Sequence, residues 1–211
     1  DYGGAVFANG ALDIINATFN KNKANSGGAV YVNSSGVNIS GSNFTENSAT
    51  TGGAIFWNQA SGSIDDCEFK QNTVTNNGGA VYVNSANSLA VIENSRFSEN
   101  QANQGGAIYL NSTNGFEVKD SNFTLNTATN NGKDIYAKDT LQTSLTNLSS
   151  NVVGNSIYVD GDVAIDGADI ASTDVNSIIF NSGNSTLSNS ELKGNNAVLI
   201  NENADVQLQN T

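Results

Sequence analysis

Acidic residues are the side chains of this sequence that come closest to a catalytic arrangement. When the repeats of the chain are aligned, Asp65 and Glu93 occupy the same outward position of successive units, about one strand spacing apart. Paired carboxylates carry out acid-base and nucleophilic steps in polysaccharide-active enzymes. Lys119 follows in the same column, and mixed charges of this kind are typical of a solvated sheet surface. We interpret the column as an exposed charge ladder and keep the acid pair as the alternative.

A second acidic cluster could bind a metal ion. It comprises Asp160, Asp162, Asp166 and Asp169. Calcium prefers oxygen-rich turns, but the spacing matches neither an EF-hand nor a glycine-rich calcium-binding repeat. We interpret the cluster as a solubilising turn, with a Ca²⁺ site as the alternative, and expect no other cofactor.

Missing residue types exclude several kinds of chemistry. The chain has no His, which rules out a Ser-His-Asp relay and a His-ligated zinc site. Its one cysteine, Cys67, falls in a column of small residues and is expected to pack rather than react. The net charge is −12, and nucleic-acid binding requires a concentrated basic face. We therefore predict a protein that is not an enzyme and does not bind nucleic acid.

An aromatic column is the candidate binding surface. It comprises Tyr31, Phe56, Tyr82, Tyr109 and Tyr136, extended by Phe7, Tyr158 and Phe180. A neighbouring column comprises Val6, Val30, Ile55, Val81, Ile108, Ile135, Ile157 and Ile179. Adjacent strand residues face opposite sides, so one column points inward. We place Val and Ile inside, because the residue before them shares the aromatic parity and includes Asp134, which is costly to bury unpaired.

An outward aromatic column would suit stacking on sugar rings or on an apolar strip of a partner. The alternative is that the Gly-Gly loops fold over the rings and bury them. Glycans are a further possibility, since Asn-x-Ser/Thr triplets begin at Asn16, Asn33, Asn38, Asn43, Asn111, Asn122, Asn147 and Asn184. Such triplets also arise by chance in a chain rich in Asn, Ser and Thr.

Two repeated motifs indicate the elements that position these residues. Gly-Gly-Ala-(Val/Ile)-(Phe/Tyr) begins at Gly3, Gly27, Gly52, Gly78 and Gly105. Phe-x-x-Asn begins at Phe19, Phe44, Phe69, Phe97 and Phe123, with decayed copies from Leu148, Ile170 and Leu192. Five residues before each Phe-type position stand Ile14, Ile39, Ile64, Ile92, Val118, Thr143, Ile165 and Leu187. The period of two predicts short strands.

Repeats of this length without a helical pattern predict a solenoid in which every strand pairs with its copy one coil away. We predict an all-β, right-handed parallel β-helix of about eight to nine coils. The absence of proline agrees, because a proline in a stacked strand removes a ladder hydrogen bond. Trp57 is expected inside, and the repeated Asn is expected to stack and to cap turns. We expect residues 1–211 to form one segment of a longer chain, with regular coils over 1–132 and shorter, degenerate coils over 133–211.

The repeats also point to a family. Gly52-Gly53-Ala54-Ile55 and Gly105-Gly106-Ala107-Ile108, alternating with Phe44-Thr45-Glu46-Asn47, resemble the repeats of polymorphic outer-membrane proteins and of large adhesin-like surface proteins of prokaryotes. The resemblance covers residues 3 to about 132. It implies a β-helical extracellular passenger or stalk with roles in adhesion and surface display, and it implies no catalytic residue.

We therefore expect a cell-surface adhesin or structural stalk located outside the cell. Its partner would be a surface receptor protein or glycan of another cell, or neighbouring copies of itself. No apolar stretch reaches the roughly 18 residues of a membrane span, so we expect no direct membrane insertion by this segment. Two alternatives stay open, a polysaccharide-active lyase or hydrolase and a subunit of a self-associating surface lattice.

Overall fold

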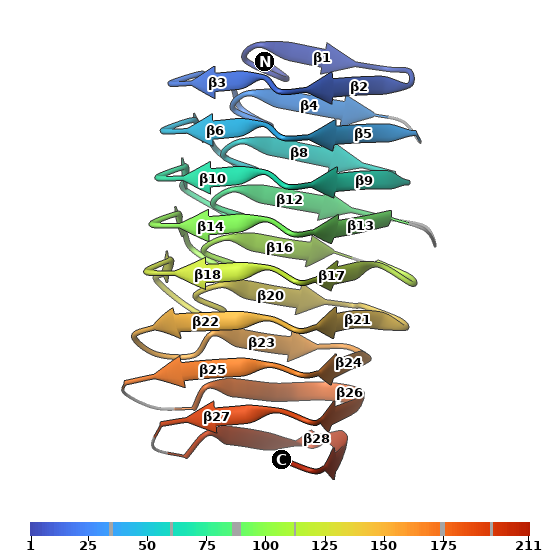
Figure 1. Ribbon diagram of the computed structural model, residues 1–211, viewed down its shortest axis with the longest axis vertical. Coiled ribbons are helices and arrows are strands. Elements are labelled where there is room, and N and C mark those ends of the chain that lie inside the picture. The colour runs from blue at the N-terminus through green and yellow to red at the C-terminus, as the bar shows by residue number, and fades with distance from the viewer. Residues whose placement is uncertain (34–35, 60, 86–89, 112, 174–175, 195) are drawn as a thin grey trace.

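Short parallel strands wind into stacked coils along one axis, from the N-terminus at one end to the C-terminus at the other (Figure 1). The structure, a computed structural model, describes residues 1–33, 36–59, 61–85, 90–111, 113–173, 176–194 and 196–211. Every strand pairing in it is parallel and joins each coil to the next, as in the pairing of Phe69 with Phe97. Eight full coils are present and the last strand begins a ninth, so the predicted parallel β-helix is confirmed.

Two walls of the coil belong to one 16-stranded sheet. The first wall comprises β1 (Val6–Ala8), β4 (Val30–Asn33), β8 (Ile55–Asn58), β12 (Val81–Asn84), β16 (Ile108–Asn111), β20 (Ile135–Lys138) and β23 (Ile157–Asp160). The second comprises β2 (Leu12–Ile15), β5 (Val37–Ser40), β9 (Gly62–Asp65), β13 (Ala90–Glu93), β17 (Glu117–Lys119), β21 (Thr143–Thr146) and β24 (Val163–Asp166). The long strands β26 (Ile178–Ser188) and β28 (Val198–Gln209) run along both walls and join them.

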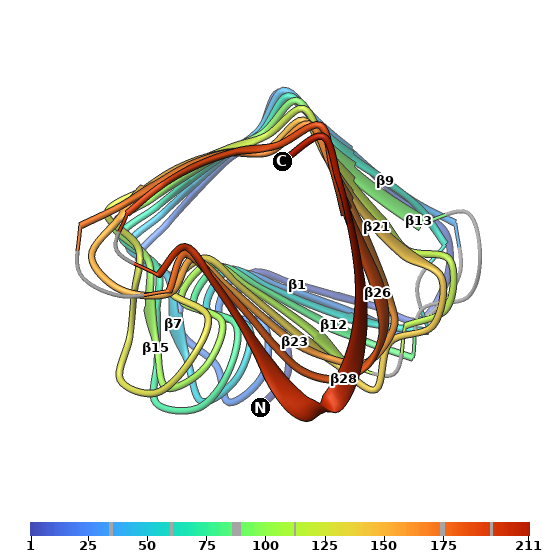
Figure 2. The ribbon, with the colours of Figure 1, turned by 90° about the horizontal axis from the view of Figure 1, so that it is seen from below.

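The third wall is an eight-stranded sheet. It comprises β3 (Thr18–Asn20), β6 (Asn43–Thr45), β10 (Glu68–Lys70), β14 (Arg96–Ser98), β18 (Asn122–Thr124), β22 (Ser149–Val152), β25 (Asp169–Ser172) and β27 (Glu191–Lys193). A small sheet of two-residue strands follows it, formed by β7 (Ser48–Ala49), β11 (Thr73–Val74), β15 (Gln101–Ala102) and β19 (Thr127–Ala128). This small sheet belongs to a lobe that projects from the coil, and the last coils lack that lobe (Figure 2).

Columns of identical side chains fill the interior. Phe44 and Phe69 are fully buried, and the rings of Phe69 and Phe97 stack with centroids 4.8 Å apart. The predicted Val and Ile column is buried on the first wall from Val30 to Ile157, and Trp57 is buried with its ring edge-on to Phe116. In-register stacking therefore buries the same residue type coil after coil, which lets large rings stack face to face.

The reason given for placing Val and Ile inside is wrong, although the placement is confirmed. Ala29 and Val30 are both buried, since their two amides donate to the same carbonyl, that of Ala54, and the chain bends there. The residue before the Val and Ile column therefore points inward as well. Asp134 occupies this corner position and is fully buried with hydrogen-bond partners, so its burial is compatible with the fold.

Two degenerate coils lie in a different register from the prediction. Phe123 pairs with Ser150, so Leu148 is not in the Phe column, and Leu145 rather than Thr143 continues the Ile column. Leu145 and Leu148 are both buried, one on each side of the turn at Asn147. This pair resembles the Ile and Phe positions of the motif, but Leu148 lies two residues before the true Phe-type position.

The second error concerns the coil that begins with β26. Ile178 pairs with Ile157, Ile179 with Tyr158, and Phe180 with Val159. Ile179 is thus in the aromatic column, and Phe180 is a fully buried core residue. A register shifted by one residue buries both Ile178 and Phe180, which stabilises this coil more than an exposed ring would.

Left-handed backbone marks the corners between the second and third walls. The residue three before each Phe-type position has positive φ: Asn16, Gly41, Asp66, Asn94, Asp120, Asn147, Gly167 and Asn189. Asn, Asp and Gly adopt this conformation at the least energetic expense, which explains the column of turn formers. In the Gly-Gly motif the second glycine has a different reason, because a Cβ on Gly53 would lie 2.0 Å from the carbonyl oxygen of Gly79.

Candidate functional site

The aromatic column forms a continuous stack on the outside of the first wall. We call it the aromatic ladder, and it comprises Phe7, Tyr31, Phe56, Tyr82, Tyr109, Tyr136 and Tyr158. Ring centroids are 4.8 Å apart for Tyr136 and Tyr158 and 5.5 Å apart for Phe7 and Tyr31. The rings of Tyr82 and Tyr109 are inclined by 4°. In-register pairing of the strands brings together every predicted member of the candidate surface except Phe180.

Each ring of the ladder covers the faces of its neighbours. Tyr109 is 4% exposed and Tyr136 is 7% exposed, whereas Tyr31, Phe56 and Tyr82 are half-buried. Burial raises the pKa of Tyr136 to about 12, with a smaller contribution from Asp160. Burial likewise raises the pKa of Tyr82. The ladder therefore offers ring edges to solvent, and stacking of a sugar on the faces of its inner rings is blocked.

The repeated Asn forms a second stack, inside the lobe. We call it the buried Asn ladder, and it comprises Asn22, Asn47, Asn72, Asn100 and Asn126. Asn72 Nδ2 donates to Asn100 Oδ1 at 3.0 Å and to the carbonyl of Phe44 at 2.9 Å. The same Asn100 oxygen also accepts the backbone amide of Asn72. The predicted structural role of this column is confirmed, because its amides satisfy one another and the backbone.

The buried Asn ladder ends on a carboxylate that the sequence analysis did not recognise as a site. Asn126 Nδ2 donates to Asp134 Oδ1 at 2.9 Å, and Ser156 Oγ donates to Oδ2 at 2.7 Å. Ser150 Oγ donates to the same Oδ2. A signal was available, since one coil has Asp in a column of Ala and Ser in the column of Phe. Two polar replacements in one coil indicate that they face each other.

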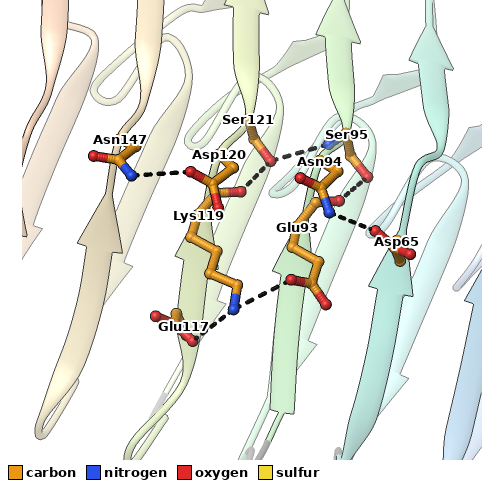
Figure 3. A network of polar contacts seen from close by, with 9 residues as sticks. All are labelled: Asp65, Glu93, Asn94, Ser95, Glu117, Lys119, Asp120, Ser121 and Asn147. Carbon is orange, nitrogen blue, oxygen red and sulfur yellow. Dashed lines mark hydrogen bonds and ion pairs between the residues drawn. The ribbon is translucent and has the colours of Figure 1, made fainter.

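The candidate acid pair lies in a network of polar contacts on the second wall (Figure 3). Asp65 and Glu93 are register partners, as predicted. Asn94 Nδ2 donates to Asp65 Oδ1 at 2.8 Å, and Lys119 Nζ lies 3.2 Å from Glu93 Oε2. The hydrogen bond with Glu93 is the main reason that the pKa of Lys119 is raised. Each carboxylate thus has its own neighbouring donor, an arrangement typical of a charge ladder on a solvated sheet.

The four candidate calcium ligands accept hydrogen bonds or ion pairs from the following coil. Asp160 accepts Ser182 Oγ at 2.6 Å, and Asp162 accepts the Asn184 amide at 2.7 Å. Ser188 and Asn189 donate to Asp166 and lower its pKa, and Asp169 pairs with Lys193. Within the described ranges, no three acidic or Cys side chains are grouped as metal ligands.

The candidate glycosylation sites differ in how their amides are used. All of them lie on the outside, with Asn111 half-buried and the other seven exposed. Side-chain amides of five donate to a neighbouring coil: Asn33 to Asn9, Asn38 to Asp13, Asn111 to Asn84, Asn122 to Ser149, and Asn147 to Asp120. Residues 34–35 and 112, which complete the triplets of Asn33 and Asn111, lie outside the described residues.

Cys67 is packed in the interior, as expected. It is 2% exposed, its Sγ donates to the carbonyl of Asp65 at 3.2 Å, and burial raises its pKa to about 11. A thiol with a raised pKa is a poor nucleophile. In the part of the chain that the structure describes, no apolar helix is long enough for a membrane span.

Comparison with known proteins identifies the architecture. A family model described as a right-handed beta helix region matches residues 2–150. No curated protein matches the sequence. One similar solved structure is that of HetL, a pentapeptide repeat protein involved in heterocyst differentiation regulation from the cyanobacterium Nostoc sp. strain PCC 7120. It is 10% identical, covers 97% of this chain and 88% of that chain, and has a TM-score of 0.25, which carries no argument about this chain.

Proposed function

Because the chain belongs to the right-handed β-helix family, we propose that it is the rigid part of a cell-surface adhesin or structural stalk, which binds or displays rather than catalyses. The observation that carries this proposal is the use of the repeated residues. The inward columns, the buried Asn ladder and the Gly-Gly turns all serve to stack one coil on the next. The outward columns are then the part of the rod that a partner can contact.

The finer resemblance to polymorphic outer-membrane proteins is part of this proposal. We propose that the rod lies outside the cell and that its partner is a receptor protein or glycan of another cell, or a neighbouring copy. Exposed Asn-x-Ser/Thr triplets on the surface support a glycosylated, extracellular protein.

The aromatic ladder is the candidate contact surface, and a partner would contact the edges of its rings. Tyr31 and Tyr82 are half-buried, so a partner reaches their hydroxyl groups and ring edges rather than their faces. Tyr31 and Tyr82 lie two coils apart with Phe56 between them, so their hydroxyl groups match a partner that offers two acceptors at that spacing, such as hydroxyl groups of a glycan or carbonyls of an extended strand.

The test uses conservative variants on cells that display the full protein. Tyr31→Phe combined with Tyr82→Phe keeps the stack and removes two hydroxyl groups, so adhesion should fall about tenfold while the melting temperature stays the same. Tyr109→Phe is the matched control, because Tyr109 is 4% exposed and its loss should leave adhesion unchanged. Unchanged adhesion in the double variant would remove the ladder from the contact surface.

Rival functions are decided by separate measurements. Depolymerisation of an acidic polysaccharide by the purified rod, with loss of activity on Asp65→Asn, would establish the enzyme alternative. Concentration-dependent association in sedimentation experiments, without binding to any other cell, would establish the surface lattice.

A further inference from the structure

A fully buried carboxylate marks the place where the coils change shape. Asp134 is 0% exposed and directly precedes β20, the first strand of the coil after the small sheet ends at β19. Its three hydrogen-bond donors are Asn126, Ser150 and Ser156. Asn126 belongs to the last coil with the lobe, Ser150 to the coil of Asp134, and Ser156 to the following coil. The carboxylate therefore ties together the two forms of the coil, and we call this place the joint.

The donors around Asp134 are neutral. Charged side chains on the elements packed there are Lys133, Lys138 and Asp160. Lys133 donates to a backbone carbonyl, Lys138 pairs with Asp139, and Asp160 accepts hydrogen bonds from the next coil. Among the described residues, the ion pairs do not include Asp134. A buried carboxylate without a cation is strongly disfavoured in its charged form.

We propose that Asp134 is a proton-binding site that makes the joint tighter in weak acid than at neutral pH. Protonation removes a buried charge and keeps the carboxyl group hydrogen-bonded, because the hydroxyl groups of Ser150 and Ser156 can accept as well as donate. Burial raises the pKa of Asp134 from 3.8 to about 6, against the opposing effect of its three hydrogen bonds.

The direction of the pH effect follows from that raised pKa. The folded chain binds the proton more tightly than the unfolded chain, in which an Asp titrates near 3.9. The contribution to stability is therefore fully present below about pH 4 and is lost as the pH rises through about 6. Over this range the equilibrium constant for opening the joint should rise by about 100-fold.

Denaturant unfolding between pH 4 and pH 8 tests the proposal. Asp134→Asn keeps the shape of the side chain and removes the titration, so its stability should lack the loss near pH 6 that the unaltered protein shows. Asp139→Asn is the matched control, because Asp139 is an exposed carboxylate five residues away whose positive φ suits Asn. The control should keep the pH dependence of the unaltered protein. Identical profiles for all three proteins would overturn the proposal.

Two further measurements locate the effect, and the first of them uses the unaltered protein. The ¹³C resonance of the Asp134 carboxyl group should titrate with a midpoint near 6 in the intact rod. The backbone amides of Ala107 and Ile135 donate hydrogen bonds to the carbonyls of Asp134 and Ser156. Hydrogen exchange of these two amides at pH 7 should then be slower in Asp134→Asn than in the unaltered protein. A midpoint below 4, or an effect on exchange spread evenly over all coils, would contradict the assignment.

Discussion

At the scale of single residues, the Asn side chain contributes differently to the free energy of unfolding in two separate Asn stacks. The buried Asn ladder lies inside the lobe, where Asn72 and Asn100 are 0% exposed. A second stack, the outer Asn ladder, comprises Asn9, Asn33, Asn58, Asn84 and Asn111 at the solvent-facing end of the first-wall strands. Water can replace a lost partner in the outer ladder but not in the buried one.

Asn100→Ala should therefore destabilise the rod strongly. Asn100 Oδ1 accepts two hydrogen bonds from Asn72, and its Nδ2 donates to Asn126 and to the carbonyl of Phe69. Removing the side chain leaves buried donors and acceptors without partners, so we expect a loss of about 3 kcal/mol or more in the free energy of unfolding. Asn84→Ala, in the outer Asn ladder, should lose less than about 1 kcal/mol in the same denaturant melts. Equal losses would show that burial does not distinguish the two stacks.

The hydrogen bonds of the side-chain amides also predict which triplets can carry a glycan. Asn16, Asn43 and Asn184 are exposed, and their Nδ2 atoms donate to no acceptor among the described residues. A glycan on Asn38, Asn122 or Asn147 would replace one of the two hydrogens on an Nδ2 atom that donates to a neighbouring coil, and would crowd its acceptor. We expect native protein to carry glycans first at Asn16, Asn43 and Asn184.

Peptide mass spectrometry of native material measures that occupancy. Glycans confined to the five amides that donate between coils would contradict the selection rule, and a bare protein would remove glycosylation from the proposal.

At the scale of the elements, the regular coils were predictable because one residue type repeats at each inward position. Strands β5, β9 and β13 contribute Ile39, Ile64 and Ile92 in register. The degenerate coils were harder to predict, because Leu145 and Leu148 are both buried. Leu148 therefore resembles the Phe-type residue of the motif, although it lies two residues before that position. The site at Asp134 could not be predicted by a rule that treats a buried carboxylate as unpaired, since its donors come from three successive coils and meet only when the coils stack.

Phe69→Ala tests the contribution of the third wall. Phe69 in β10 is fully buried and stacks on Phe44 and Phe97, so its removal leaves a cavity between two rings. We expect a loss of about 3 to 5 kcal/mol in the free energy of unfolding. Glu68→Ala is the control from the same strand, because Glu68 is exposed and its change should stay within about 0.5 kcal/mol. A loss below about 1 kcal/mol for Phe69→Ala would show that the Phe column does not support the core.

At the scale of the whole molecule, the acidic character of the rod raises the question of cations. The carboxylates of Asp160, Asp162, Asp166 and Asp169 already have hydrogen-bond or ion-pair partners. We therefore expect the melting temperature to be the same in a chelator and in millimolar Ca²⁺. A calcium-dependent rise that is lost in Asp162→Asn would restore the metal-site alternative.

The buried Asn ladder has a consequence for how the chain is assembled. A coil that forms one residue out of register would point its Asn side chain away from the Asn of the preceding coil. The Oδ1 atom of one Asn and the Nδ2 atom of the other would then be buried without partners. A coil in the wrong register is thus destabilised as soon as it stacks on the preceding coil, rather than after the whole rod has formed. Apolar columns tolerate a slip of two residues, which exchanges one buried Val for another, as with Val81 and Val83, whereas an amide accepts only the right counterpart. The ladder therefore favours the correct register while the coils form, and it ends on Asp134, directly before β20, where the shorter coils begin.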